Sequence, residues 1–136
     1  MRVGLKINQH ELTWPALVSR AGRADELGFD NLWIFDHFRP QTAPLTGPCM
    51  EAWSLLAALA VTTTRIRLGA LATGVMWRNP AVLAAQAATI DNLAEGRLEI
   101  AINDVRDQSS ANDHPDLGSL ELRRSTIRQA LTRIAG

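Results

Sequence analysis

The chain has 136 residues, of which 46% are hydrophobic, and this length suits one globular domain with one core. Its 14 basic and 14 acidic side chains cancel, so net charge gives no attraction for nucleic acid or an anionic membrane. The single cysteine, Cys49, has no partner for an intrachain disulfide, which favours a cytoplasmic protein. The sequence also lacks the pattern of a signal peptide or a transmembrane span.

The first part of the chain predicts two strands separated by a helix. Residues 2–8 alternate apolar and polar side chains, as a strand does. Residues 14–27 repeat apolar residues at helical spacing, after Thr13 as N-cap and before Gly28 as a residue that ends the helix. Residues 31–37, "NLWIFDH", predict the second strand, and the proline-rich "RPQTAPLTGP" that follows predicts a loop.

The rest of the chain continues the alternation. Asn79 and Pro80 predict an N-cap and the first position of a helix that ends near Leu93. The further expected elements are helix 49–62, strand 65–73, helix 80–93, strand 97–103 and, after a polar stretch at 104–116, helix 119–134. This order predicts an α/β fold over residues 1–136, with parallel strands joined by crossover helices. Ligand sites are then expected at the carboxyl ends of the strands.

Asp36 and His37 fall at the carboxyl end of the second predicted strand, where such a fold gathers its functional groups. In one interpretation His37 gives or takes a proton near neutral pH, and Asp36 orients it or binds a ligand. In the other, Asp36 caps backbone amides in a loop beside a partly exposed histidine. Spacing alone favours the second interpretation.

Other polar residues carry weaker signals. His10-Glu11 begins like a zinc-helix motif, but Trp14 stands where the second histidine should be, so no metal site is expected. Glu99 alternates with aliphatic residues, which predicts a buried, hydrogen-bonded structural acid. In "ATGVMW", residues 72–77, a glycine precedes a β-branched residue at a strand end, which predicts a bulge or irregular peptide.

Residues 81–90, "AVLAAQAATI", form a helical segment without charge, whereas an outer helix of a monomer normally has a charged face. The segment is either a subunit interface, together with the apolar helix 49–62, or a tightly enclosed alanine-rich helix. The residues leave both possibilities open.

Several longer segments resemble the luciferase-like monooxygenase superfamily. They are "AGRADELGFDNLWIFDHF", "EAWSLLAALAVTTTRIRLGALATGV", "RNPAVLAAQAATIDNLAEGRLEIAI" and the later "LGSLELRRSTIRQAL". The resemblance implies a (β/α)8 barrel, and an enzyme that uses FMN or the deazaflavin coenzyme F-420 to transfer hydride to or from a small-molecule substrate.

The resemblance also implies roles for individual residues. His37 matches the acid/base histidine beside the cofactor ring, and Asp36 is its neighbour or a ring contact. Thr73, Gly74 and Val75 match the wall behind the ring, with a non-proline cis peptide expected at Gly74-Val75. Asn103 lies where the fourth strand approaches the cofactor. Relatives have a glycine-rich "GIGAGW"-like loop there, and this chain has "AINDVR".

A complete barrel needs about 250 residues, so this chain is expected to supply about four strand-helix units, half of a barrel. A homodimer is expected, either through helices 49–62 and 80–93 or through the open edges of the sheet. The alternative function is a non-catalytic, truncated half-barrel that acts only in self-association or partner binding.

Overall fold

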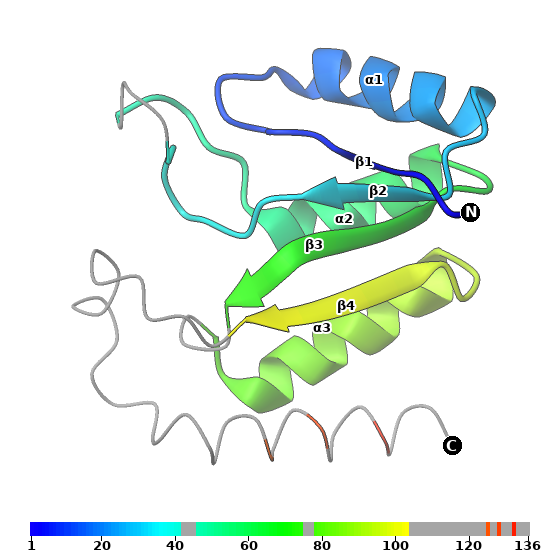
Figure 1. Cartoon of the computed structure of the whole chain (residues 1–136). Coiled ribbons are helices and arrows are strands. Elements are labelled where there is room, and N and C mark those ends of the chain that lie inside the picture. Colours follow the sequence, from blue (N-terminus) through cyan, green and yellow to red (C-terminus); the bar gives the residue numbers. More distant parts are fainter. Residues whose placement is uncertain (42–45, 75–77, 104–124, 126–127, 129–131, 133–136) are drawn as a thin grey trace.

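A computed structural model describes residues 1–41, 46–74, 78–103, 125, 128 and 132 of the chain. The predicted polar stretch and most of the predicted last helix lie outside these residues. In the described part, strands and helices alternate (Figure 1). The elements are β1 (Gly4–Lys6), α1 (Trp14–Glu26), β2 (Asn31–Ile34), α2 (Ala52–Thr62), β3 (Arg67–Gly74), α3 (Pro80–Leu93) and β4 (Leu98–Asn103).

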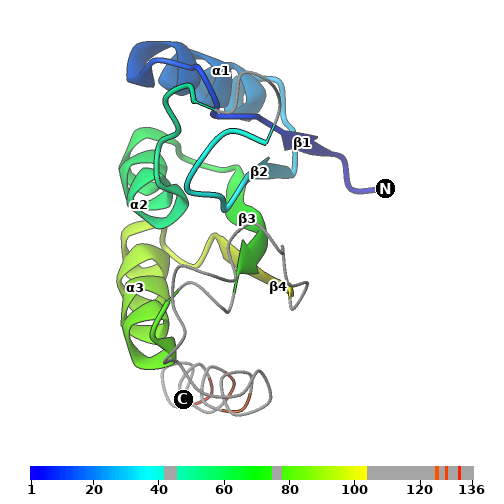
Figure 2. The same ribbon diagram turned by 90° about the vertical axis from the view of Figure 1, so that its left-hand side faces the viewer.

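The four strands form one parallel sheet in the order β1-β2-β3-β4, so each strand pairs with the next one along the chain. Figure 2 shows α1, α2 and α3 together on one face of this sheet. A doubly wound sheet carries helices on both faces, whereas a (β/α)8 barrel keeps consecutive strands inside and all helices outside. The described sheet therefore has the arrangement of half a barrel, which confirms the predicted fold class.

The helix ends follow local sequence chemistry. The Thr13 side chain caps α1 by accepting the Ala16 N–H at 3.4 Å, and Asn79 caps α3 by accepting the Ala81 N–H at 2.9 Å. Gly28 follows α1 with a φ of 79°, a conformation that costs glycine little. Each of these boundaries agrees with the prediction.

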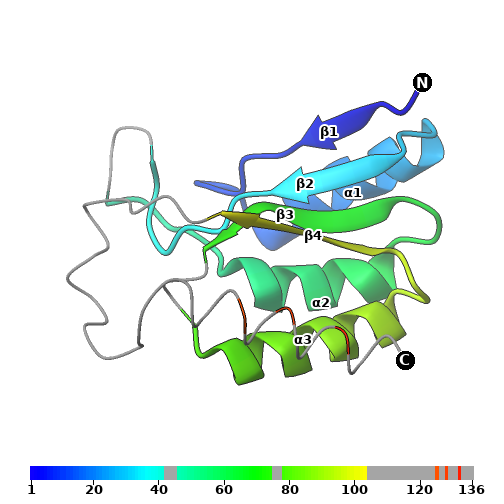
Figure 3. The ribbon, with the colours of Figure 1, turned by 60° about the horizontal axis from the view of Figure 1, so that its bottom comes forward.

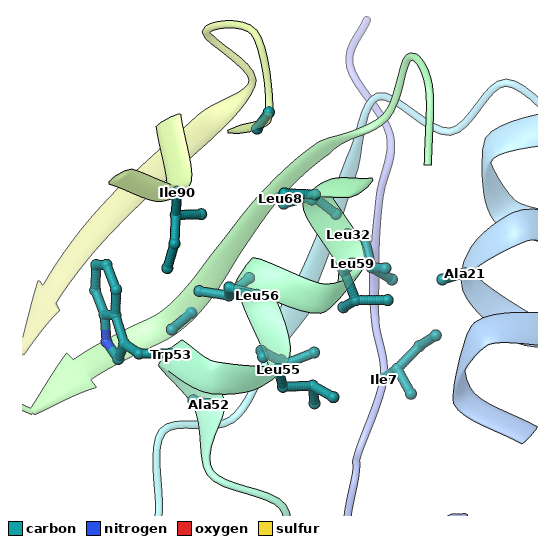
Figure 4. Close-up of a cluster of buried hydrophobic side chains, with 14 of the residues drawn as sticks. Ile7, Ala21, Leu32, Ala52, Trp53, Leu55, Leu56, Leu59, Leu68 and Ile90 are labelled. Carbon is teal, nitrogen blue, oxygen red and sulfur yellow. The ribbon is translucent and has the colours of Figure 1, made fainter. Parts of the chain in front are cut away.

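The core lies between the helices and the sheet. In Figure 4, Leu56 and Leu59 of α2 extend toward Leu32 and Leu68 of the sheet. These four side chains are at most 1% exposed, so each contributes about 1.5–3 kcal/mol by burial. The cluster also includes Ile7, Ala21, Ala52, Trp53, Leu55 and Ile90. Helix α2 thereby packs on the sheet and contacts both α1 and α3.

The opposite face of the sheet is organised around Trp33. Its indole lies over Gly69, where an added Cβ would collide with the ring and would lie 2.6 Å from the backbone O of Glu99. Glu99 accepts hydrogen bonds from Asn31 Nδ2 and, at 2.6 Å, from Arg67 Nε. The carboxylate is hydrogen-bonded as predicted, but its side chain is 23% exposed rather than fully buried.

Several details differ from the expectations. Strands β1 and β2 are shorter than the predicted 2–8 and 31–37, and β2 ends at Ile34, before Asp36 and His37. The predicted helix 49–62 begins at Ala52, because Glu51 acts as its N-cap. A register shift between Ala70 and Thr73, opposite β4, overlaps only the start of the irregular stretch expected at 72–77. A non-proline cis peptide bond joins Leu71 and Ala72, three residues before the expected place at Gly74-Val75, whose second residue is outside the described part. The described helices are all too short or too polar to cross a membrane.

Candidate functional site

The four strands point their carboxyl ends the same way (Figure 3). Asp36 and His37 follow β2 at this edge, and Gly74 is the last residue of β3. Gly74 pairs in register with Asn103, the last residue of β4. Residues predicted from separate parts of the sequence are therefore gathered at the carboxyl ends of the strands.

Asp36 is held by three donors in a buried position. Its carboxylate, with the residue 2% exposed, accepts hydrogen bonds from Arg78 Nη1 and Nη2 at 2.6 and 2.7 Å. The Gly74 N–H donates to the same carboxylate at 3.0 Å. A bidentate arginine pair combines charge with fixed geometry. Asp36 therefore ties the end of β2 to the end of β3 and to the segment that begins α3.

Glu51 extends this ion pair to the start of α2. Arg78 Nη2 donates to Glu51 Oε1 as well, and the Glu51 carboxylate caps α2 through the N–H groups of Trp53 at 3.1 Å and Ser54 at 2.7 Å. Burial alone would raise the pKa of Glu51, but these hydrogen bonds outweigh it and lower that pKa. The Arg78 pKa is raised, because Asp36 and Glu51 outweigh the effect of its own burial. We call Asp36, Arg78 and Glu51 the carboxyl-end clamp.

His37 follows directly after the clamp. The residue is half-buried, and its ring lies 5.9 Å from the ring of Phe35, measured between centroids. The His37 carbonyl accepts a hydrogen bond from Cys49 Sγ at 3.2 Å. Burial and the charge of Asp36 raise the pKa of the Cys49 thiol, which favours its protonated, donating form. The backbone is thus held both before His37, through Asp36, and at its own carbonyl, through Cys49.

The end of β1 supports the same region. Buried Gln9 bonds to both backbone groups of Phe35, accepting the N–H at 3.0 Å and donating to the carbonyl. The His10 ring stacks on Phe35 at 5.5 Å, and His10 Nδ1 accepts the Gln41 N–H at 3.4 Å. Burial lowers the pKa of His10, while Glu11 acts in the opposite sense. A neutral His10 with Nδ1 as acceptor carries its proton on Nε2.

Three polar atoms near the carboxyl ends of the strands are buried without a hydrogen-bond partner in the described part of the chain. They are His10 Nε2, beyond β1, Thr73 Oγ1, next to the last residue of β3, and Trp53 Nε1, in the first turn of α2. Buried polar groups normally have partners, so each such atom calls for an explanation. Thr73 is fully buried. Val75 and the Asn103 side chain lie outside the described part, so their predicted roles stay predictions.

Sequence reasoning did not identify Arg78 or Gln9. Arg78 immediately precedes the N-cap Asn79, and an arginine between a strand and a helix has many ordinary surface roles. Gln9 ends an apolar alternation only one residue before a histidine. Glu51 gave a usable signal, since an acid before an alanine-rich helix is a good N-cap. Among the described residues, no group of three or more His, Cys, Asp or Glu side chains is placed to hold a metal ion.

Comparison with known proteins adds to this geometry. The chain is 34% identical over 104 residues to an F420-dependent glucose-6-phosphate dehydrogenase of Amycolatopsis mediterranei, covering 75% of the chain and 31% of the relative. It is 32% identical over 139 residues to the enzyme of the same name from Intrasporangium calvum, covering 97% and 40%. The chain therefore spans about two fifths or less of the length of these relatives.

Solved structures show the same fold. An F420-dependent secondary alcohol dehydrogenase in complex with an F420-acetone adduct superposes with a TM-score of 0.77 at 22% identity, over 98% of this chain and 41% of that one. The oxygenating constituent of 3,6-diketocamphane monooxygenase from Pseudomonas putida, in complex with FMN, gives a TM-score of 0.72 at 20% identity, over 98% and 38%. The family model for luciferase-like monooxygenases matches residues 1–109, most of the chain. The chain belongs to the luciferase-like monooxygenase family.

Proposed function

We propose that this chain supplies one half of a ring-cofactor site in an oxidoreductase that transfers hydride between a small-molecule substrate and a flavin or deazaflavin. Family membership and the activities named for the relatives support an oxidoreductase. A complete site is expected to need the other half of a barrel, because the pocket of such a barrel is built from loops of all its strands.

The observation that carries the proposal is the carboxyl-end clamp. Asp36 uses its carboxylate for Arg78 and the Gly74 N–H, so its contribution is to hold the backbone. The adjacent His37 is thereby fixed near the carboxyl ends of the strands, where parallel α/β folds bind ligands. His37 would accept the proton that a substrate hydroxyl loses when its carbon is oxidised. In the reverse direction His37 would donate that proton.

The residues at this edge fit a planar, polar ring. FMN or the deazaflavin would supply the hydride-accepting ring chemistry. His10 Nε2 and Thr73 Oγ1 are buried polar atoms without a partner in the described residues, and they belong to the ends of β1 and β3, on either side of β2. They would hold polar edges of the ring, and the backbone at Gly74 would approach it without a side chain. Val75 and Asn103 remain proposed contacts from the family resemblance, and of the two roles that it implied for Asp36 we propose the neighbour of His37 rather than the ring contact.

We propose the deazaflavin coenzyme F-420 as the first candidate and FMN as the second. The relatives of over 30% identity quoted above carry F420-dependent names, whereas a structure with FMN matches at 20% identity. The substrate is proposed only as a small molecule. A cytoplasmic location and the absence of nucleic-acid or membrane partners remain proposals from composition.

A titration tests the proposal. The chain is mixed with coenzyme F-420 or with FMN, and ring fluorescence is followed to saturation. We expect saturable binding of one ring, weakened at least tenfold by Gly74→Trp, whose side chain would occupy the ring's place. Gly22→Ala on α1 is the matched control, since an added Cβ there meets nothing within 4 Å. If neither ring binds at high micromolar concentration, the oxidoreductase proposal for this chain fails and the non-catalytic half-barrel replaces it.

We also propose a homodimer, and two surfaces compete for it. The outer sides of α2 and α3 expose Val61, Val82 and Leu93 at 64%, 54% and 43%. The uncharged α3 segment is thus only partly enclosed, so this helix surface is one candidate interface. The second surface is formed by the open edges of the sheet.

A further inference from the structure

The outer side of β1 leaves backbone hydrogen-bonding groups unpaired. The Val3 carbonyl accepts the Asp30 N–H at 2.9 Å, and the Ile7 N–H donates to the Trp33 carbonyl at 2.8 Å. Residues 3, 5 and 7 therefore direct their backbone groups toward β2, because alternate residues of a strand face opposite neighbours. Gly4 and Lys6 consequently direct their N–H and C=O groups outward, where no described strand pairs with them.

The outer side of β4 is similar. The Leu68 N–H donates to the Arg97 carbonyl at 3.0 Å, so odd-numbered residues of this strand face β3. The Leu98 N–H faces outward and is satisfied by Asp91 Oδ1 at 3.1 Å. Ile100 and Ile102 then present outward backbone groups that no described strand pairs with. Unpaired strand edges of this kind tend to pair with another chain.

Apolar surface accompanies both edges. A cavity of about 480 Å³ lies between β1 and α1, and its lining includes Leu5, Leu27 and Phe29. Leu27 is 59% exposed, and at the other edge the Ile102 side chain is 42% exposed. In a closed barrel such a groove lies between neighbouring βα units and is filled by the next unit.

The number of strands in a closed barrel indicates what could cover the two open edges. Closure requires eight parallel strands with all helices outside, and one described chain supplies four strands in that arrangement. A second copy would supply the other four strands. Strand β4 of one copy would pair in parallel with β1 of the other copy. The same pairing on the opposite side of the ring would close it with two-fold symmetry. The formal net charge of +0 gives the copies no mutual repulsion.

We propose that the β1/α1 edge and the β4 edge of this chain bind a second copy of it, forming an eight-stranded ring of two chains. In this ring the carboxyl-end clamps of both copies lie on the same rim, and each His37 faces the partner copy's half of the pocket. The proposal concerns assembly and stands whether or not a ring cofactor binds.

Mass and amide exchange test the proposal together. Light scattering should give about twice the chain mass of 14.9 kDa. Hydrogen exchange by NMR should show slow amides at Gly4, Lys6 and Ile102, at least 100-fold slower than in an unstructured chain. A dimer with fast exchange at these amides would mean association through α2 and α3, and would overturn the proposal. A monomer would also overturn it, and a monomer with slow edge amides would show that this same chain covers its own edges.

Matched variants separate the two surfaces. Lys6→Pro and Ile102→Pro each remove an outward N–H and no bond within the described sheet, so each should shift the mass to that of the monomer while far-ultraviolet circular dichroism stays near wild type. Val82→Glu places a charge on exposed α3 and should leave the dimer intact. Loss of the dimer in Val82→Glu, with retention in both proline variants, would assign the interface to the helices.

Discussion

Both ends of the sheet hold a buried aspartate, and the two residues are used differently. At the amino end, Asp25 is 7% exposed and accepts the N–H groups of Thr64 at 2.7 Å and Ile66 at 2.9 Å. At the carboxyl end, Asp36 accepts from Arg78 and Gly74. Both carboxylates are saturated by donors of the protein itself. Saturation therefore marks a structural acid and does not distinguish a functional end from a stabilising one.

The difference lies in what each aspartate positions. Asp25 fixes the turn between α2 and β3, and next to it Arg97 donates to the carbonyls of Ala60, Thr63 and Ile66. These contacts of Asp25 and Arg97 hold the amino end of the sheet together. Asp36 fixes the backbone directly before His37, whose side chain is half-buried. The clamp and the proposed acid/base residue are therefore neighbours in sequence with separate proposed tasks.

The largest effect is expected from breaking the carboxyl-end clamp. Arg78→Met leaves Asp36 buried without its cation and should lower the free energy of unfolding by about 3–5 kcal/mol. Urea unfolding measures it. Arg23→Met is the control, because the Arg23–Glu26 pair is exposed and should contribute less than about 1 kcal/mol. Equal losses in the two variants would show that the clamp does not hold the carboxyl end together.

The contribution of Asp25, at the amino end of the sheet, to the free energy of unfolding should be lost at low pH. Burial raises the pKa of Asp25, but hydrogen bonds from Thr64, Arg65 and Ile66 outweigh it, so the pKa lies below its ordinary value of 3.8. A carboxyl group with a lowered folded-state pKa stabilises the fold above its unfolded pKa, and this contribution is lost as the pH falls toward the folded value. Asp25→Asn should therefore flatten the fall of unfolding free energy below about pH 4. A slope identical to wild type would remove Asp25 as its source.

A smaller loss of stability is expected from a change at Gly69, on the face of the sheet opposite the helices. Gly69→Ala should cost about 1–3 kcal/mol, because the new Cβ meets the Trp33 ring and the backbone of Glu99. Gly22→Ala in α1 meets nothing within 4 Å and should instead stabilise by about 0.5–1 kcal/mol. Thermal unfolding of the pair compares them directly, and a neutral Gly69→Ala would mean that Trp33 moves freely.

The fold was predictable because hydrophobic periodicity and capping residues are local signals. Thr13, Gly28 and Asn79 mark helix boundaries that the structure confirms. The position of Asp36 and His37 at a strand end was also predictable from the order of strands and helices along the chain. The partner of Asp36 was not, because Arg78 is 42 residues away and an ion pair over that distance depends on tertiary packing. The register shift between Ala70 and Thr73 overlaps only the start of the irregular stretch predicted at 72–77, because apolar alternation continues through the shift; residues 75–77 lie outside the described part.

The central claim is that Asp36 serves the fold while His37 serves the ligand. The most direct measurement is ring affinity in His37→Ala, by fluorescence titration of protein whose unfolding free energy has first been shown to lie within about 1 kcal/mol of wild type. The account predicts that this stably folded variant binds coenzyme F-420 or FMN at least tenfold more weakly than wild type. Undiminished ring binding in folded His37→Ala, or a loss of stability as large as that of Arg78→Met, would contradict it.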